Sequence, residues 1–382
     1  MRILRQLAGP IVVGLMLTVA APAAQAQTVK VDKKVQKAAE EEQQAILQLV
    51  ADVEKGTPAP SDYAVTLTND FFKAGDKQTW VPMTIAFPAK QASPNGYTLY
   101  IQATLAGEAG KAQAEREAEE AKKKADAARR AALEAEELTA PSQAPEVRTK
   151  PTPVVQQLYY LDAAKATGTL SVSRGISLPP GEYELLVLVR DRSWNPDPKK
   201  NQNKKDVVLK AGVLTKAVTV PDYWAGGLGT SSVVLADKVE PVTQELKPDA
   251  LVKRPYVFGK DEWVPSADAK FTTSEELAFY FQIYNAVLGS DNRPDVSIDY
   301  MFYVKPASDG AAAKERYFNK TDPVVYNSTT LPPAFDGNRH VLAGAQQIPL
   351  ASFAPGEYRL EITVTDKLGK TSVKRNVVFT VG

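Results

Sequence analysis

One four-residue motif, Pro-Gly-Glu-Tyr, occurs twice and constrains the fold of this chain more than any other feature. The copies begin at Pro180 and Pro355, 175 residues apart, so each half of the chain carries one. An alternating apolar and polar run follows the second copy, and a run that is apolar at Leu186 and Leu188 as well follows the first. Each run precedes a last strand-like segment, at 213–220 or 373–381. Alternation with a period of two is typical of half-buried strands. The repeat therefore predicts two similar β modules.

The chemistry of the motif explains why it should open a strand. Proline fixes φ at the first position of a turn, and Gly181 or Gly356 can supply the positive φ that a type II turn requires next. Tyr183 and Tyr358 would then place their rings in the core, with each hydroxyl free to return to the backbone. That arrangement is the tyrosine corner of immunoglobulin-like sandwiches. We expect these four residues to be structural.

The two modules resemble bacterial Ig-like modules of the fibronectin type III and polycystic-kidney-disease kind. In those modules the penultimate strand often begins Pro-Gly-x-Tyr and ends near an aspartate, as at Asp191 and Asp366. The last 200 residues or so also resemble the C-terminal β modules of uncharacterised secreted bacterial proteins with GWxTD or von Willebrand factor A-related domains. The chain lacks a Gly-Trp-x-Thr-Asp string and an Asp-x-Ser-x-Ser metal motif. The resemblance thus implies architecture and carries no functional residue.

These patterns predict an all-β fold with added helices. Two Ig-like antiparallel β-sandwiches would occupy 58–236 and 255–382, joined by a polar, proline-containing linker at 237–254. Apolar residues at three- and four-residue spacing predict an N-terminal helix within 27–57. Residues 108–138 are almost all Ala, Glu, Lys and Arg, which predicts a long helical insertion in the first β domain.

The two predicted helices raise different questions. Alanines spaced by four and three residues along 108–138 form a heptad seam, which would suit a coiled coil or a docking arm. A solvated single helix held by Glu–Lys pairs is the alternative, because alanine buries little area. The 27–57 helix should cover Leu186 and Leu188, since exposing them would forfeit about 1.5–3 kcal/mol each. Its apolar stripe consists of Ile46, Leu49, Val50 and Val53.

The first 26 residues have the features of a secretory signal peptide. Arg2 and Arg5 precede an apolar run at 11–20, and Ala24-Gln25-Ala26 forms a small-x-small cleavage site. The run is shorter than the ~20 residues needed to span a bilayer. We expect cleavage before Gln27 and a periplasmic or secreted protein without a transmembrane anchor; an uncleaved anchor is the alternative.

Composition limits the chemistry. The chain has no cysteine, which rules out disulfides, thiolate metal sites and a lipid anchor at the cleavage point. Its single histidine, His340, cannot build a His/Cys zinc site, and no nucleophile or phosphate-loop motif is present. A net charge of +1 gives the chain no overall electrostatic attraction to nucleic acid. We expect no cofactor, metal or enzymatic activity, although 45 acidic residues leave a hydrolase with a carboxylate pair as an alternative.

Two surfaces are candidate binding sites. The outer faces of strands 277–284 and 296–304 carry Tyr280, Tyr284 and Tyr303, which suit protein or glycan contacts. Ordinary β-propensity on a solvated face would also explain them. The second surface is the loop 192–206, whose candidates are Trp194, Lys199 and Lys200.

Together the sequence predicts an exported, non-enzymatic envelope or secreted protein that binds or spaces a protein partner. Its binding elements would be the Ig-like domains and the helical arm. A carbohydrate-binding sandwich with an aromatic sheet face is the alternative function. The sequence leaves the oligomeric state open.

Overall fold

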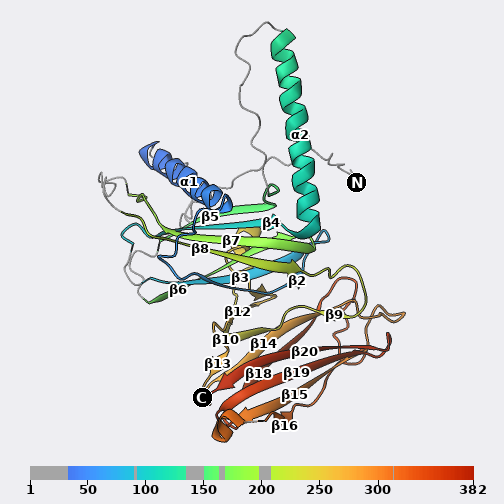
Figure 1. Cartoon of the computed structure of the whole chain (residues 1–382). Coiled ribbons are helices and arrows are strands. Elements are labelled where there is room, and N and C mark those ends of the chain that lie inside the picture. Colours follow the sequence, from blue (N-terminus) through green and yellow to red (C-terminus); the bar gives the residue numbers. More distant parts are fainter. Residues whose placement is uncertain (1–32, 90–92, 135–149, 163–167, 198–207, 313) are drawn as a thin grey trace. The chain divides into compact units, whose positions relative to one another are not determined.

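A computed structural model describes most of the chain after its N-terminal segment (Figure 1). The described residues are 33–89, 93–134, 150–162, 168–197, 208–312 and 314–382. The predicted signal peptide at 1–26 and the candidate residues Lys199 and Lys200 lie outside these ranges. The described chain is mostly β-strand and divides into two compact units. The first comprises described residues of 1–66, 86–171 and 182–218, and the second those of 67–85, 172–181 and 219–382.

The first unit is built on a four-stranded sheet of order β5-β4-β7-β8. These strands are β4 (Tyr97–Leu105), β5 (Val155–Leu161), β7 (Gly181–Asp191) and β8 (Ala211–Val220). Strand β4 pairs antiparallel with both neighbours. On its inner face, the rings of Tyr63, Phe87 and Tyr97 pack edge to face, with centroids 5.1–5.9 Å apart.

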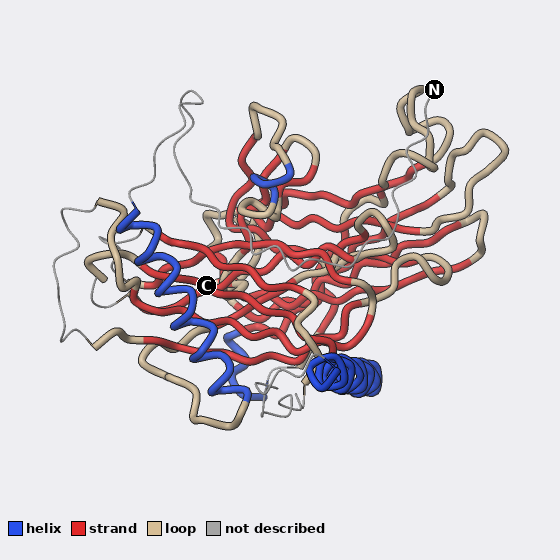
Figure 2. The backbone as a smooth tube through the Cα atoms, turned by 90° about the horizontal axis from the view of Figure 1, so that it is seen from above, coloured by secondary structure: helices blue, strands red, loops and turns tan. Residues whose placement is uncertain are grey.

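Helix α1 (Lys33–Glu54) packs on the outer face of this sheet (Figures 1 and 2). Ile46 and Val50 are buried against Leu186 and Leu188, which confirms the predicted cover; Leu49 packs at the edge of the cluster. The helix ends in a glycine cap. Gly56 has a φ of +99°, and the amide of Thr57 donates to the carbonyl of Asp52 at 2.9 Å, as in a Schellman C-cap.

A buried carboxylate fixes α1 to the sheet below it. Glu42 is 1% exposed and lies on the same helix face as Ile46. Its carboxylate accepts hydrogen bonds from the Thr98 hydroxyl (3.0 Å), the Ser193 amide (3.2 Å) and the Arg190 guanidinium (3.4 Å). Because a buried charge is tolerated only when it is paired and hydrogen-bonded, these bonds define one position for the helix.

Helix α2 (Gly107–Glu134) follows β4 directly and stands away from the sheet of its own unit (Figures 1 and 2). Its base is held by Glu117, which accepts the amide of Thr152 at 2.8 Å and its hydroxyl at 2.9 Å. The side chains from Glu119 to Lys124 are exposed, including Ala121 of the predicted alanine seam. An i,i+4 pair of Lys123 with Glu119 at 2.7 Å supports the helix along its length.

The second unit contains two six-stranded sheets. The β14 sheet has the order β11-β12-β10-β14-β18 with β9 beside β14, and the β19 sheet has the order β13-β20-β19-β15-β16 with β17 beside β15. The β14 sheet consists of β9 (Gly229–Thr230), β10 (Val234–Pro241), β11 (Val257–Phe258), β12 (Asp261–Pro265), β14 (Glu276–Tyr284) and β18 (Leu342–Pro349). The β19 sheet consists of β13 (Lys270–Phe271), β15 (Val296–Pro306), β16 (Arg316–Lys320), β17 (Val324–Tyr326), β19 (Gly356–Asp366) and β20 (Thr371–Val381).

These two sheets form a sandwich. Alternate residues of β14 and of β15 and β19 are buried in one shared core. The rings of Phe279 and Tyr300 meet across it with centroids 5.4 Å apart. The half-buried alternation predicted for 296–304 is therefore confirmed. For 277–284 the apolar set does face this core, but the other face of β14 is also buried, at Ala278, Tyr280 and Tyr284.

Other short elements complete the described chain. A further sheet has the order β1-β3-β2 with β6 beside β3. Its strands are β1 (Thr66–Asn69), β2 (Phe72–Lys73), β3 (Thr79–Pro88) and β6 (Thr169–Leu178), and the short helices are α3 (Pro248–Leu251) and η2 (Ala307–Ala312). The stretch 237–254, predicted as a linker, includes the end of β10 and α3. Because β10 pairs with both β12 and β14, residues 237–241 are part of a sheet.

The repeated motif opens matching strands, as predicted. Tyr183 lies in β7 and Tyr358 in β19, two strands of equal length in different units, and each strand neighbours the strand that follows it in the chain. Tyr358 is 1% exposed and its hydroxyl donates to the carbonyl of Ala354 at 2.7 Å, which is a tyrosine corner.

The prediction of a type II turn is wrong for both copies of the motif. Gly181 has a φ of +150°, far from the ~+80° of a type II turn, and Gly356 has no positive φ. At Gly356 a Cβ atom would lie 2.7 Å from the carbonyl oxygen of Lys305. Glycine is needed there because β15 and β19 approach closely.

Candidate binding face

The outer face of the β19 sheet carries a row of four large side chains. Strand register sets Tyr317 of β16 opposite Tyr303 of β15, Tyr303 opposite Arg359 of β19, and Arg359 opposite Val378 of β20. Three strand spacings give this row a length of about 14 Å. We call these four residues the Arg359 row. Each member of the row has a neighbour along its strand that packs in or against the core, so the alternation of the sheet places the row on its outer surface. These core neighbours are Phe318, Phe302, Val304, Tyr358, Leu360 and Phe379.

Arg359 lies at the centre of the row and is held from two sides. Its guanidinium carbon lies 4.1 Å from the centroid of the Tyr303 ring, a cation–π contact. Its Nε and Nη2 atoms donate to the two carboxylate oxygens of Glu315 at 2.9 and 2.8 Å, and Nη1 donates to Asn376 at 2.6 Å. The hydrogen bonds from Arg359 lower the pKa of Glu315 and, in return, those with Glu315 raise the pKa of Arg359. The arginine is thus preorganised with its charge retained.

The ends of the row are open to solvent. Tyr317 is 55% exposed and Val378 is 52% exposed, which is high for an aromatic and a β-branched side chain. Tyr303 is half-buried, and Tyr317 meets its ring edge to face with centroids 6.2 Å apart. An aromatic and apolar surface therefore surrounds a fixed cation.

Charged residues flank the row on the neighbouring cross-strand positions. On one side Lys305 pairs with Glu357 at 2.6 Å. On the other, Glu361 accepts Lys374 at 2.9 Å and Arg359 at 3.2 Å, and these bonds lower the pKa of Glu361, with Lys374 as the larger cause. The face thus has an aromatic and arginine centre with a charged rim.

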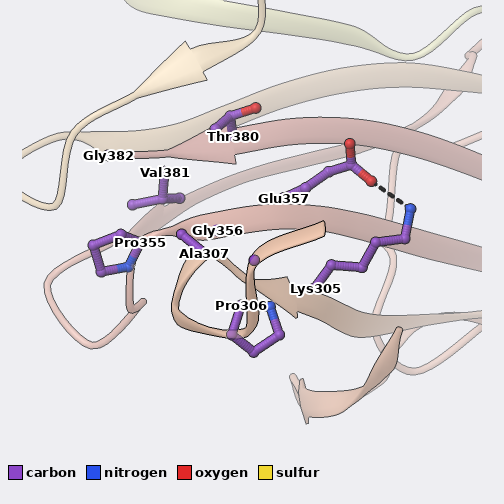
Figure 3. A pocket seen from close by; sticks show the side chains of 10 residues that line it. Lys305, Pro306, Ala307, Pro355, Gly356, Glu357, Thr380, Val381 and Gly382 are labelled. Atoms are coloured by element: carbon purple, nitrogen blue, oxygen red, sulfur yellow. Dashed lines mark hydrogen bonds and ion pairs between the residues drawn. The ribbon is translucent and has the colours of Figure 1, made fainter. Parts of the chain in front are cut away.

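A hollow of about 560 Å³ borders this face at the turn into β19 (Figure 3). It is lined by the second copy of the repeated motif, by Lys305 to Ala307 and by the last residues of β20. Figure 3 shows the ion pair of Lys305 with Glu357 along one side of the hollow. A partner side chain that reaches past the Arg359 row could enter there.

The tyrosines predicted as one binding surface lie on opposite sides of the sandwich. Strands β14 and β15 belong to different sheets, so Tyr280 and Tyr284 face away from Tyr303. Both are buried: Tyr280 stacks on Phe258 with centroids 4.5 Å apart, and the Tyr284 hydroxyl accepts the amide of Lys73 at 2.9 Å. The expectation of a single exposed aromatic face that includes Tyr280 is wrong. Tyr303 alone of the three lies in the Arg359 row.

The loop candidates also need correction. Trp194 is 5% exposed and packs edge to face on Tyr160 with centroids 4.9 Å apart, while Arg192 lies 5.1 Å from its ring. It is therefore a packing residue of the first unit and is not an exposed contact for a partner.

The described residues show capping where aspartates end the matching strands. Asp366 accepts the amides of Val287 at 2.8 Å and Gly369 at 2.9 Å, and Asp191 accepts the Tyr63 hydroxyl at 2.7 Å.

Within the described ranges no three His, Cys, Asp or Glu side chains are grouped so that they could hold a metal ion. Nor does any described helix combine the length and the apolar character needed to cross a membrane.

Three members of the row were missed as binding residues. Of the row, the sequence pattern pointed only to Tyr303 as a binding residue, and it gave no reason to choose Arg359, Tyr317 or Val378. The alternation of Arg316, Tyr317 and Phe318 is a weak strand signal that could have placed Tyr317 on an outer face. Nothing local in the sequence shows that it lies beside Tyr303.

Comparison with known proteins identifies no family. No family model matches the chain, and no curated protein matches it. Among solved structures, Salmonella alpha-2-macroglobulin reacted with methylamine aligns with 85% of this chain at 12% identity and a TM-score of 0.19. The native conformation of E. coli alpha-2-macroglobulin aligns with 85% of it at 12% identity and a TM-score of 0.21. The chain spans 17% and 16% of the length of those proteins.

Proposed function

We propose that this chain is an exported, non-enzymatic protein that binds a protein partner through the Arg359 row. The observation that carries the proposal is the row itself: two tyrosines, a preorganised arginine and an exposed valine, aligned across four strands. Tyrosine and arginine are enriched where binding energy concentrates in protein interfaces, and charged rims surround such centres. Because Arg359 is already held by Glu315, little side-chain freedom is lost on binding.

The remaining elements fit a role in the cell envelope or outside the cell. A signal peptide at 1–26 would export the chain, and two Ig-like modules would form its body. Helix α2, exposed beyond its base, would act as a spacer or a second contact for the partner. Its alanine seam suits close approach of another helix, because small side chains let helix backbones come near.

A glycan remains the alternative ligand, on Tyr303 and Tyr317 of the same face. A protein is favoured because Arg359 occupies one face of the Tyr303 ring, which leaves less aromatic surface for stacking a sugar. The buried Tyr280 and Tyr284 offer no additional platform.

Photo-crosslinking in the native envelope tests the proposal. A benzophenone amino acid placed at Tyr317 or Val378 should give one defined protein adduct, and the same group at Val341 should not. Val341 is a matched control, since it is 57% exposed in the same unit but lies next to β18 of the other sheet. Adding Arg359→Ala should abolish the adduct. Equal adducts at all three positions, or glycan-array binding lost in Tyr317→Ala without any protein adduct, would overturn it.

A further inference from the structure

The last strand of the β19 sheet has one unpaired edge. Strand β20 pairs with β19 along its whole length, but on its other side β13 covers only Thr380 and Val381. The amide of Thr380 donates outward to Ala269 at 2.9 Å. Because backbone groups alternate sides along a strand, the amides and carbonyls of Ser372, Lys374, Asn376 and Val378 point outward too. We call residues 372–378 the free edge.

The free edge is longer and more regular than the other edges of this unit. The register of β20 with β19 runs without a break from Val381 to Thr371. Strand β16 carries a register shift where it pairs with β15. On β18 the carbonyl of Ala343 accepts the Tyr326 hydroxyl at 2.7 Å, and Pro349 has no amide to donate. Bulges and proline are usual means of blocking an edge against further pairing, and neither occurs in 372–378. The edge is protected only by charge: Lys374 and Arg375 lie on it, and Nη1 of Arg375 donates to the outward carbonyl of Lys374 at 3.1 Å.

We propose that the free edge accepts an extended segment of the protein partner as an additional strand of the β19 sheet. The inference rests on the proposed function, since Val378 belongs to both the free edge and the Arg359 row. Strand addition would satisfy the four outward amides and three of the four outward carbonyls, and would displace Arg375 from the fourth, that of Lys374. It would also place the partner beside Tyr303 and Arg359. Main-chain hydrogen bonds supply the affinity in such complexes, and alternate side chains supply the specificity.

The side chains of β20 define the chemistry of the segment. On the inner side Val373 and Val377 are half-buried and flank Arg375, which donates to the backbone carbonyls of Lys374 and Thr230, so these bonds leave its charge unbalanced. On the outer side Lys374 is exposed and pairs with Glu361 at 2.9 Å. Lys370 precedes the strand, so the edge is basic. The segment that fits carries β-branched residues opposite the two valines and acidic residues opposite Lys374 and Arg375, because unlike charges on opposed strands attract.

A second copy of this chain fits the edge less well. If two β20 strands paired antiparallel over all of 372–378, the centre of the pairing would place Arg375 opposite Arg375. Like charges directly opposite each other destabilise a strand pair. The charge pattern therefore favours a different, acidic protein over self-association.

Residue-resolved amide exchange on the full mature chain, measured by NMR, tests the edge. In the free chain the amides of residues 372, 374, 376 and 378 should exchange fast, while those of 373, 375 and 377, which bond to β19, stay protected. The probe is the end-blocked peptide Val-Val-Thr-Glu-Glu-Val-Thr, whose antiparallel register places its two Glu opposite Arg375 and Lys374. Its addition should protect the four outward amides. A control peptide with Lys in place of both Glu should bind roughly tenfold more weakly.

Two substitutions at one position separate the edge from the fold. Asn376→Pro removes an outward amide and no backbone bond to β19, so it should keep the fold and abolish peptide binding. It also removes the side-chain acceptor of Arg359, which Asn376→Ala removes equally. Asn376→Ala should keep both, and the exchange pattern of the unsubstituted chain still tests the proposal if the proline variant does not fold. Arg359→Ala should abolish the photo-adduct of Tyr317 but leave protection by the peptide intact, which separates the two proposals.

Four results would overturn the inference, and the last of them leaves the proposed function standing. The first is protection of the four outward amides in the free chain. The second is equal binding of the Glu and Lys peptides. The third is a concentration-dependent dimer, seen by sedimentation, that Asn376→Pro abolishes, because the occupant would then be a second copy. A Tyr317 adduct that persists in Asn376→Pro would leave the proposed function standing and remove the added strand.

Discussion

The buried carboxylate beneath α1 gives the sharpest test of how the first unit is held together. We consider Glu42→Gln, which keeps the shape of the side chain and removes its charge. The carboxylate has no exposed surface in its side chain, whereas the paired Arg190 side chain is 17% exposed. The substitution leaves Arg190 without its counter-charge. It also replaces one carboxylate oxygen, which accepts hydrogen bonds from Thr98, Ser193 or Arg190, by an amide group that can only donate.

The size of the effect follows from these contacts. Breaking a buried pair by changing one partner costs about 3–5 kcal/mol. The Arg190 contact is long at 3.4 Å, and that residue keeps some access to water, so we expect the low end, about 3 kcal/mol. Loss of the anchor should also loosen α1 over Leu186 and Leu188, whose amides would exchange faster.

The assay is urea denaturation followed by circular dichroism, together with amide exchange at Leu186 and Leu188. Glu41→Gln is the matched control, because Glu41 is the neighbouring glutamate, its side chain is 65% exposed and it pairs with Lys37 at 3.8 Å. An exposed pair of this kind contributes at most ~1 kcal/mol. If Glu42→Gln and Glu41→Gln lower the free energy of unfolding equally, the anchor has no special role and the reasoning is refuted.

Three further predictions concern the motif and the buried tyrosines. Tyr358→Phe should cost about 1–1.5 kcal/mol in urea denaturation, since it removes the hydroxyl that bonds Ala354; no loss would contradict the tyrosine corner. Gly356→Ala should destabilise by more than about 1 kcal/mol because its Cβ would meet a carbonyl at 2.7 Å, whereas Gly227→Ala, with nothing within 4 Å, should stay within about 0.5 kcal/mol. Burial raises the pKa of Tyr160 to about 12, so the stability that its neutral form gives is present below pH ~10 and is lost as the pH rises to about 12; ultraviolet titration and denaturation at each pH would check this, and a Tyr160 that ionises near 10 would contradict it.

Sequence patterns predicted well what depends on neighbouring residues. The motif at Pro180 and Pro355 opens matching strands, and this was predictable because a repeated motif followed by an apolar strand pattern is a local signal, even though the predicted turn type was wrong. The cover over Leu186 and Leu188 was also predictable, because exposing two leucines is costly and one apolar helix stripe was available. The first prediction rests on the periodicity of apolar residues, and the second also on the free-energy cost of exposing two leucine side chains.

Strand pairing and close approach could not be predicted in the same way. A period of two shows which residues share a face but does not show which strand lies alongside. Tyr280 and Tyr303 therefore seemed to share a surface, although their strands belong to facing sheets. Glu315 and Arg359 form their bidentate pair across 44 residues, so no local signal marks it. The sequence pattern placed Gly356 in a turn that needs a positive φ. In the structure, glycine is needed there because the neighbouring strand approaches too closely for a Cβ atom.

The most direct test of the central claim is the yield of the Tyr317 photo-adduct in living cells with arginine, lysine or alanine at position 359. If the Arg359 row binds a protein, arginine should give a single adduct, alanine should give none, and lysine should recover only part of the yield, because it cannot bond both oxygens of Glu315. An adduct of equal yield in all three chains would contradict the account.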